Sequence, residues 1–197
     1  MAGEMSGEMS GKLAGKMADG TRAERVLDDL RDLKPWTASA SDQVRARIAP
    51  ASKAGGLCLH YDFAGVSGYA VARRELPVQW PAHPSVQLRW RGSGGPNTVQ
   101  IKWVDASGDN VWWNNRSDAE LPERWQPLRI PAHRIDFAWG PSADKTLRET
   151  RYMEIVAVAG KAGGRGQVCV DDIRLQAQPP APAVWPGSHE ASNLARE

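Results

Sequence analysis

The sequence predicts an all-β protein, an antiparallel β-sandwich of the jelly-roll type with disordered termini. From Val26 onward, about eleven short apolar runs are separated by Gly, Pro, Asn, Asp or Ser, a pattern typical of strands joined by turns. Several of these runs alternate between apolar and polar residues with a period of two. No run has the length and periodicity of a convincing helix, and only residues 142–150 are expected to form a turn or a short helix. Many short strands without helices favour a sandwich or jelly roll.

The expected strands follow one another through the middle of the chain. In the run 98–104, Val99, Ile101 and Trp103 alternate with Gln100 and Lys102, which places the apolar residues on one face of a strand. The runs 57–63 and 153–159 show the same alternation. The complete set is 26–32, 36–40, 44–49, 57–63, 69–76, 86–91, 98–104, 111–115, 125–130, 153–159 and 167–175.

The 197 residues divide into a central module and two tails. Residues 1–24 contain a four-residue repeat of Gly and Met or Leu, and its glycines oppose helix formation, so we expect a disordered or weakly helical tail. Residues 25–176 hold all the expected strands and form the β-sandwich. Residues 177–197 are rich in proline and are expected to be a linker that leads to another domain.

Charge and hydropathy argue against several classes of function. Lys and Arg number 25 against 23 Asp and Glu, a formal net charge of +2, and the basic residues are scattered along the chain. We therefore expect neither nucleic-acid binding nor a polybasic membrane surface. No apolar run approaches the 18 or so residues of a membrane span. The first 20 residues lack the apolar stretch of a signal peptide, so the sequence as written is not marked for export.

Motifs for catalysis and metal binding are missing from the sequence. It contains no P-loop, no GxGxxG before a helix, no HExxH and no GxSxG. Its histidines, His60, His83, His133 and His189, have no ligand partner at metal spacing. Because no acid–base pair can be named, the protein is expected not to be an enzyme and to need no cofactor.

The two cysteines allow at most one disulfide bond. Cys58 and Cys169 both lie in apolar, strand-like runs, where a free cysteine behaves as a small hydrophobic residue. The sequence therefore favours buried free thiols, with a disulfide as the alternative.

Two pairs of adjacent carboxylates are candidate ligands for calcium. Asp28–Asp29 and Asp171–Asp172 fall in the first and last expected strands, and neighbouring residues of a strand point to opposite faces. Each pair is expected to end a strand and cap a turn. If the first and last strands lie side by side, the same oxygens become candidates for a structural calcium ion.

Tryptophan is unusually abundant, with nine residues against three Tyr and two Phe. Trp112 and Trp113 are adjacent in a strand, so one is expected in the core and the other on the outer surface. Flat rings beside amides, carboxylates and a guanidinium are suited to a sugar, because rings cover its apolar face while polar groups bind its hydroxyls. Residues of this kind gather at 112–116 and 134–139: Trp112, Trp113, Asn114, Asn115, Arg116, Arg134, Asp136, Phe137 and Trp139.

Residues 26–175 also resemble a known family. The segments VLDDLRDL before Trp36, GYAVARRELP, VQLRWRG, NTVQIKWVDASGD, WQPLRIP and GQVCVDDIRL, in this order, resemble the galactose-binding-like jelly roll of family-11 carbohydrate-binding modules and their complex I assembly-factor relatives. More closely, GVSGY, VDASGDNVWWNN and FAWGP resemble an uncharacterised bacterial module found ahead of discoidin-type and glycosidase-like domains.

The resemblance implies a non-catalytic module that binds a polysaccharide or oligosaccharide in a cleft across one sheet, in an extracytoplasmic or cell-envelope setting. The residues that match the family's cleft are Tyr69, Asp109, Arg134, Asp136 and Phe137. Together with Trp112, Trp113 and Trp139 they make up the expected sugar-binding site.

Two other functions remain open at this point. One is an intracellular protein-interaction or assembly domain, as in the assembly-factor relatives, which fits the missing signal peptide. The other is an accessory domain of a glycosidase that packs against a catalytic partner and binds no sugar alone.

Overall fold

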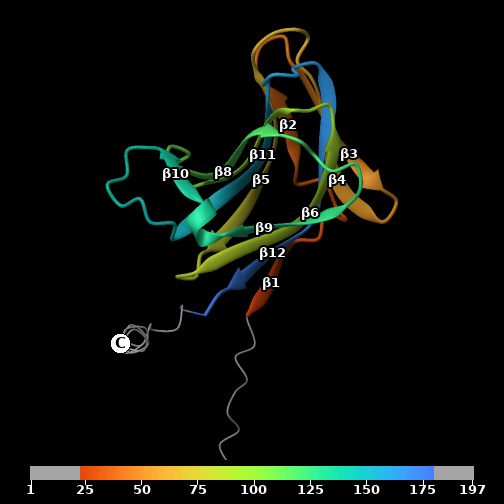
Figure 1. Cartoon of the computed structure of the whole chain (residues 1–197). Coiled ribbons are helices and arrows are strands. Elements are labelled where there is room, and N and C mark those ends of the chain that lie inside the picture. Colours follow the sequence, from red (N-terminus) through yellow and green to blue (C-terminus); the bar gives the residue numbers. More distant parts are fainter. Residues whose placement is uncertain (1–22, 180–197) are drawn as a thin grey trace, which may run out of the picture.

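The computed structural model of the chain describes residues 23–179, which form two packed antiparallel sheets (Figure 1). Sheet A has the strand order β3-β4-β12-β6-β9, with β1 paired to β12, and sheet B has the order β10-β8-β7-β11-β5-β2. The expected tails fall almost entirely outside the described residues. The elements are β1 (Glu24–Asp28), β2 (Thr37–Ala40), β3 (Arg45–Ser52), β4 (Gly55–Asp62), β5 (Tyr69–Gln79), β6 (Pro84–Ser93), β7 (Asn97–Val104), β8 (Val111–Ala119), β9 (Gln126–Pro131), the 3₁₀ turn η1 (Ala132–Arg134), β10 (Asp136–Trp139), β11 (Glu149–Val158) and β12 (Arg165–Ala177).

The predicted all-β sandwich is confirmed, and each expected strand has a counterpart. Two local expectations are wrong. Residues 142–148 form a loop and no helix: the Asp144 carboxylate accepts hydrogen bonds from the Thr146 N–H and the Arg148 guanidinium, and β11 begins at Glu149. The first strand ends at Asp28 instead of continuing to residue 32: the Asp28 carboxylate accepts a hydrogen bond from the Leu30 N–H, and Leu30 has a positive φ of 56°, so the chain turns there.

The core lies between the sheets and is built from alternate residues of facing strands. Leu59 of sheet A and Ile101 and Ile155 of sheet B belong to one buried cluster. Trp103 is fully buried, with its ring centroid 5.3 Å from that of Trp80 and the two rings nearly perpendicular. Part of the tryptophan excess therefore fills the core, as the alternation in β7 predicts.

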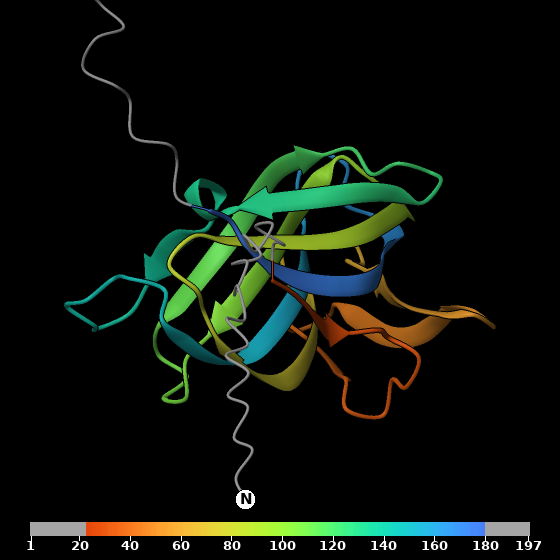
Figure 2. The same ribbon diagram turned by 90° about the horizontal axis from the view of Figure 1, so that it is seen from below.

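The ends of the described chain meet at one side of sheet A. Glu24 of β1 lies opposite Gln176 of β12, and Figures 1 and 2 show the two strands side by side. The Asp28 carboxylate accepts hydrogen bonds from the Trp36 indole at 2.9 Å and the Arg74 guanidinium at 2.6 Å. This ion pair is shielded from solvent and joins β1 to sheet B.

The carboxylates nominated for calcium are bound by protein donors. The Asp28 carboxylate is bound by Trp36 and Arg74, and Asp29 accepts a hydrogen bond of 3.1 Å from the Arg31 N–H. Asp171 pairs with Arg89, and Asp172 pairs with Arg174 at 2.9 Å. Within residues 23–179, no group of three or more His, Cys, Asp or Glu side chains is placed to hold a metal ion. These carboxylates therefore stabilise the first and last strands through arginine and tryptophan.

The expectation of free thiols is wrong, because Cys58 and Cys169 form a disulfide bond. The two residues are direct cross-strand partners on β4 and β12, and their Cα atoms are 4.0 Å apart. Both side chains lie on the outer face of sheet A and are nevertheless buried. Burial is expected for free thiols and for a disulfide alike. The pairing of β4 with β12 is what brings the two cysteines close enough to form the bond.

The structure shows no element suited to crossing a membrane as a helix. Among residues 23–179, no helix is long and apolar enough to span a bilayer.

Candidate functional site

The outer face of sheet B carries a row of chemically distinct side chains across five adjacent strands. The register pairs Arg73 of β5 with Glu154 of β11, Glu154 with Lys102 of β7, Lys102 with Trp113 of β8, and Trp113 with Asp136 of β10. Cross-strand partners point to the same face of a sheet, so these five residues share the outer face. The row places cations, carboxylates and an aromatic ring next to one another.

Further rows of the same face add amides and apolar side chains. Gln100 and Asn115 are cross-strand partners, and the Gln100 amide donates a hydrogen bond of 2.9 Å to the Asn115 side-chain oxygen. Tyr69 lies opposite Val158 at the far end of β5. The face therefore carries amide side chains beside apolar and aromatic ones.

A hollow of about 470 Å³ runs over this face. Only three large hydrophobic side chains are strongly exposed among residues 23–179, and two of them, Tyr69 at 48% and Trp139 at 47%, line it. Exposed rings gathered in one hollow indicate a binding surface, since isolated exposed rings would be scattered. The complete lining is Ser39, Tyr69, Val71, Arg73, Gln100, Lys102, Trp113, Trp139, Glu154, Val156 and Val158.

The rings at one end of the hollow are arranged for contact with more than one surface of a ligand. The centroids of Trp113 and Trp139 are 5.4 Å apart and their planes meet at 89°. Perpendicular rings cannot both lie flat against the same sugar ring. When one tryptophan stacks its face on a sugar, the other contacts that sugar with its edge. The Lys102 ammonium lies 4.9 Å from the Trp139 centroid and 5.9 Å from the Trp113 centroid, close enough for a cation–π contact.

The charged row holds two cations, Arg73 and Lys102, and two carboxylates, Glu154 and Asp136. The Arg73 guanidinium donates to the Glu154 carboxylate at 2.6 Å, and it also lies 4.1 Å from the Tyr152 ring centroid. Burial lowers the pKa of Lys102, while the nearby Glu154 carboxylate acts in the opposite direction. With Asp136 at the end of the row, the face holds both donors and acceptors without a large excess of either sign.

The residues predicted from the sequence fall into three positions relative to this hollow. Tyr69, Trp113 and Trp139 line it. Trp112 faces the other way: it is buried, its indole N–H donates to the Lys145 carbonyl at 2.8 Å, and Phe137 packs against it edge to face. The adjacent tryptophans therefore divide between the two faces of β8, as strand geometry predicts.

The remaining predicted residues lie around the rim. Asp136 ends the charged row on the edge strand β10 and is exposed. Asp109 is exposed in the β7–β8 turn, whose backbone at Asp109 closely approaches Gly140, the residue after Trp139. Arg134 is exposed in η1, and its carbonyl accepts a hydrogen bond of 2.9 Å from the Asn114 amide.

Several polar residues of the hollow were not predicted as site residues from the sequence: Arg73, Gln100, Lys102 and Glu154. The sequence does indicate that Gln100, Lys102 and Glu154 face away from the core, because they are the polar members of alternating strands. It does not give the order of strands in the sheet, which places β7 beside β11 and β11 beside β5 and so brings these residues together.

The fold of residues 23–179 is similar to that of solved family 11 carbohydrate-binding modules. The family 11 carbohydrate-binding module of a cellulosomal cellulase of Clostridium thermocellum superposes with a TM-score of 0.60 at 18% sequence identity, covering 79% of this chain and 95% of that one. The Clostridium thermocellum family 11 module in complex with a β-1,3-1,4-mixed-linked tetrasaccharide gives a TM-score of 0.59, also at 18% identity, and covers 77% of this chain and 94% of that one. The predicted resemblance is thus confirmed for the fold.

Part of a larger enzyme has a similar shape. An exo-β-agarase matches with a TM-score of 0.54 at 14% identity, covering 81% of this chain but only 26% of the enzyme. No protein-family model matches the sequence, and no curated protein matches it at a significant level.

Proposed function

We propose that this protein is a non-catalytic carbohydrate-binding module that holds a neutral polysaccharide or oligosaccharide in the hollow on sheet B. The observation that carries the proposal is the meeting of Tyr69, Trp113 and Trp139 with a charge-balanced row of donors and acceptors in one open hollow. Rings stack on the apolar faces of sugars, and the polar row offers hydrogen bonds to their hydroxyls.

The same geometry favours binding over catalysis. Glycoside hydrolysis needs two carboxyl groups placed on either side of the bond that breaks. Glu154 is the carboxylate of the lining, and it is held by the Arg73 guanidinium. A carboxylate paired with a guanidinium is suited to accept a hydrogen bond from a sugar hydroxyl.

The disulfide bond supports an extracytoplasmic location. Disulfides form and persist in oxidising compartments and are rare in the cytosol. The Cys58–Cys169 bond therefore favours a secreted or cell-envelope glycan binder over the alternative of an intracellular assembly domain.

Titration of the full chain with neutral polysaccharides tests the proposal. We expect saturable binding to at least one of mixed-linked β-glucan, xylan, galactan and agarose oligosaccharides. Binding is measured by the change in tryptophan fluorescence and by calorimetry. An open hollow with hydrogen bonds of about 1 kcal/mol net each implies a dissociation constant on the order of 10 µM to 1 mM. A folded protein that binds none of these sugars would contradict the proposal and favour the accessory-domain alternative.

A further inference from the structure

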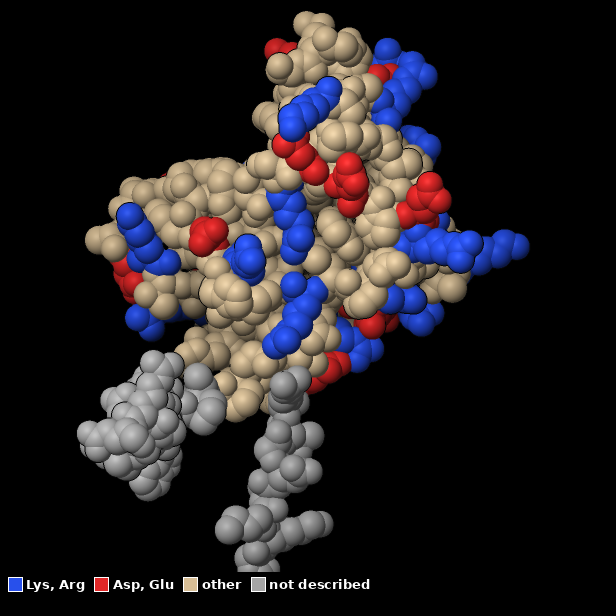
Figure 3. All heavy atoms as spheres, in the orientation of Figure 1, with Lys and Arg blue, Asp and Glu red and all other residues tan. Residues whose placement is uncertain are grey.

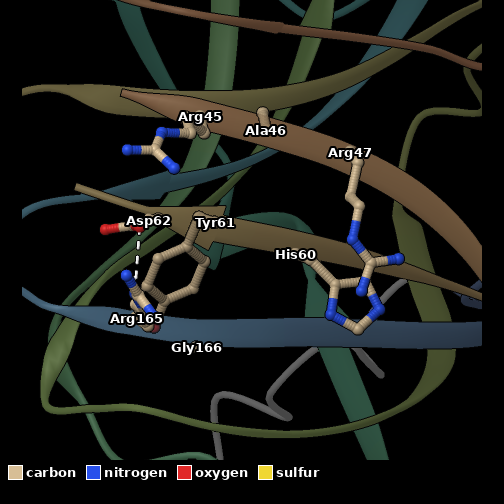
Figure 4. A pocket seen from close by; sticks show the side chains of 8 residues that line it. All are labelled: Arg45, Ala46, Arg47, His60, Tyr61, Asp62, Arg165 and Gly166. Atoms are coloured by element: carbon tan, nitrogen blue, oxygen red, sulfur yellow. Dashed lines mark hydrogen bonds and ion pairs between the residues drawn. The ribbon is translucent and has the colours of Figure 1, made fainter. Parts of the chain in front are cut away.

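A second hollow, of about 480 Å³, lies on the outer face of sheet A, opposite the sugar-binding face (Figure 4). Arg45 and Arg47 come from the edge strand β3, His60 and Asp62 from β4, and Arg165 from β12. Figure 4 shows Arg165 bound to Asp62 at one end and the Arg47 side chain reaching toward the His60 ring at the other. In Figure 3, basic side chains line the right-hand edge of the molecule, where β3 and β4 lie.

The strand register arranges these side chains in two rows. Arg45, Asp62 and Arg165 are cross-strand partners in the first row, and Arg47 faces His60 in the second. Gln167 continues the second row on β12. Nearly every outward side chain in these rows donates hydrogen bonds, and the exception is the carboxylate of Asp62.

Three guanidiniums and one carboxylate line this hollow, a larger excess of positive charge than the two cations and one carboxylate that line the hollow on sheet B. The Asp62 carboxylate accepts a hydrogen bond from the Ala64 N–H and pairs with Arg165 at 2.9 Å, and these interactions, the Ala64 hydrogen bond first, lower the pKa of Asp62. Within residues 23–179, neither Arg45 nor Arg47 takes part in an ion pair or a side-chain hydrogen bond. Two guanidiniums thus remain available for an external anion.

The spacing of the charges matches a chain with repeated anionic groups. Arg45 and Arg47 are two residues apart on one strand, about 7 Å, and Arg165 lies two strands away from Arg45, about 10 Å. Duplex DNA, with one charge per roughly 1.7 Å, needs a denser basic surface than three arginines around an aspartate. A polysaccharide with a carboxylate or sulfate on successive sugars suits the sparser arrangement.

We propose that the hollow formed by Arg45, Arg47, His60 and Arg165 is a second binding site, which takes the carboxylate or sulfate groups of an acidic polysaccharide. Guanidiniums bind both groups through paired, charge-assisted hydrogen bonds. The Cys58–Cys169 bond joins β4 to β12 in the next row and holds the floor of the site in register.

His60 gives the site an internal reporter. Burial, followed by the charge of Arg47, lowers the pKa of His60. The other charged groups around it are Asp62 on its own strand, Arg45 on β3 and Arg165 on β12. A bound carboxylate or sulfate favours the imidazolium form, so the ligand should raise the pKa of His60 in an NMR titration.

The test is binding of polygalacturonate and dextran sulfate to the full chain at low ionic strength. We expect both to bind, and we expect Arg45→Gln/Arg47→Gln to weaken binding about tenfold or more while its affinity for the neutral sugar is unchanged. A matched control, Lys34→Gln/Lys53→Gln, removes the same charge at exposed positions outside both hollows and should change affinity less than about twofold.

Several outcomes would overturn this site without overturning the binding of neutral sugar. An equal loss in the lysine control would mean that only overall charge matters. Loss of acidic-polysaccharide binding in Trp113→Ala/Trp139→Ala, with the arginine variant unaffected, would move the ligand to sheet B. Duplex DNA bound as tightly as polygalacturonate, or no binding of either acidic chain, would leave Arg45 and Arg47 only the role of protecting an exposed sheet edge.

Discussion

Trp113→Ala/Trp139→Ala is expected to abolish measurable binding of neutral polysaccharide while leaving the fold intact. The two rings form one end of the hollow on sheet B and lie within 5.4 Å of each other. Removing stacked rings costs on the order of 1–2 kcal/mol each, so the pair should lower affinity at least about thirtyfold. Because the parent affinity is weak, the variant should show no saturation in calorimetry.

The fold should survive because both side chains point away from the core. Trp139 is 47% exposed on an edge strand, and Trp113 belongs to the outer row of β8. Trp125→Ala, which removes the same residue type from outside this hollow, is the matched control and should bind the polysaccharide normally. Unchanged affinity in Trp113→Ala/Trp139→Ala would show that neither ring contributes to binding of the polysaccharide.

Loss of the Cys58–Cys169 bond is expected to cause the largest change in stability. The bond joins residues 111 positions apart, and in the chain-entropy model a loop of that length stabilises the folded state by about 4–5 kcal/mol. Cys58→Ala/Cys169→Ala should therefore unfold at a clearly lower denaturant concentration than the oxidised protein. Reductant should shift the parent protein toward the variant and leave the variant unaffected.

A difference of less than about 1 kcal/mol between the oxidised protein and the alanine variant would contradict this expectation.

The strands were predictable because their signal is local. The predicted strand 98–104 matches β7 almost residue for residue. Its apolar residues Val99, Ile101 and Trp103 are buried in the core, and they alternate with the polar Gln100 and Lys102. The edge strand β10 was missed: it has only four residues, and its register against β8 shifts between Phe137 and Trp139. Such a segment has too little periodicity to stand out from a loop.

The site was predicted only in part because it depends on the order of strands. Adjacency of Trp112 and Trp113 showed that one ring must face outward, and Trp139 stood out in its local segment. Tyr69 was predicted from the family resemblance. Arg73, Lys102 and Glu154 meet because three strands far apart in the chain are neighbours in sheet B. The disulfide escaped prediction for the same reason, since it requires β4 beside β12.

The most direct test of the central claim is an NMR titration of the tryptophan indole N–H signals with the polysaccharide or oligosaccharide that binds. Sugar in the hollow on sheet B should shift the indole signals of Trp113 and Trp139 and leave those of the buried Trp80 and Trp103 in place. Shifts confined to Trp90 or Trp125, with Trp113 and Trp139 unmoved, would contradict the claim that this hollow is the sugar-binding site.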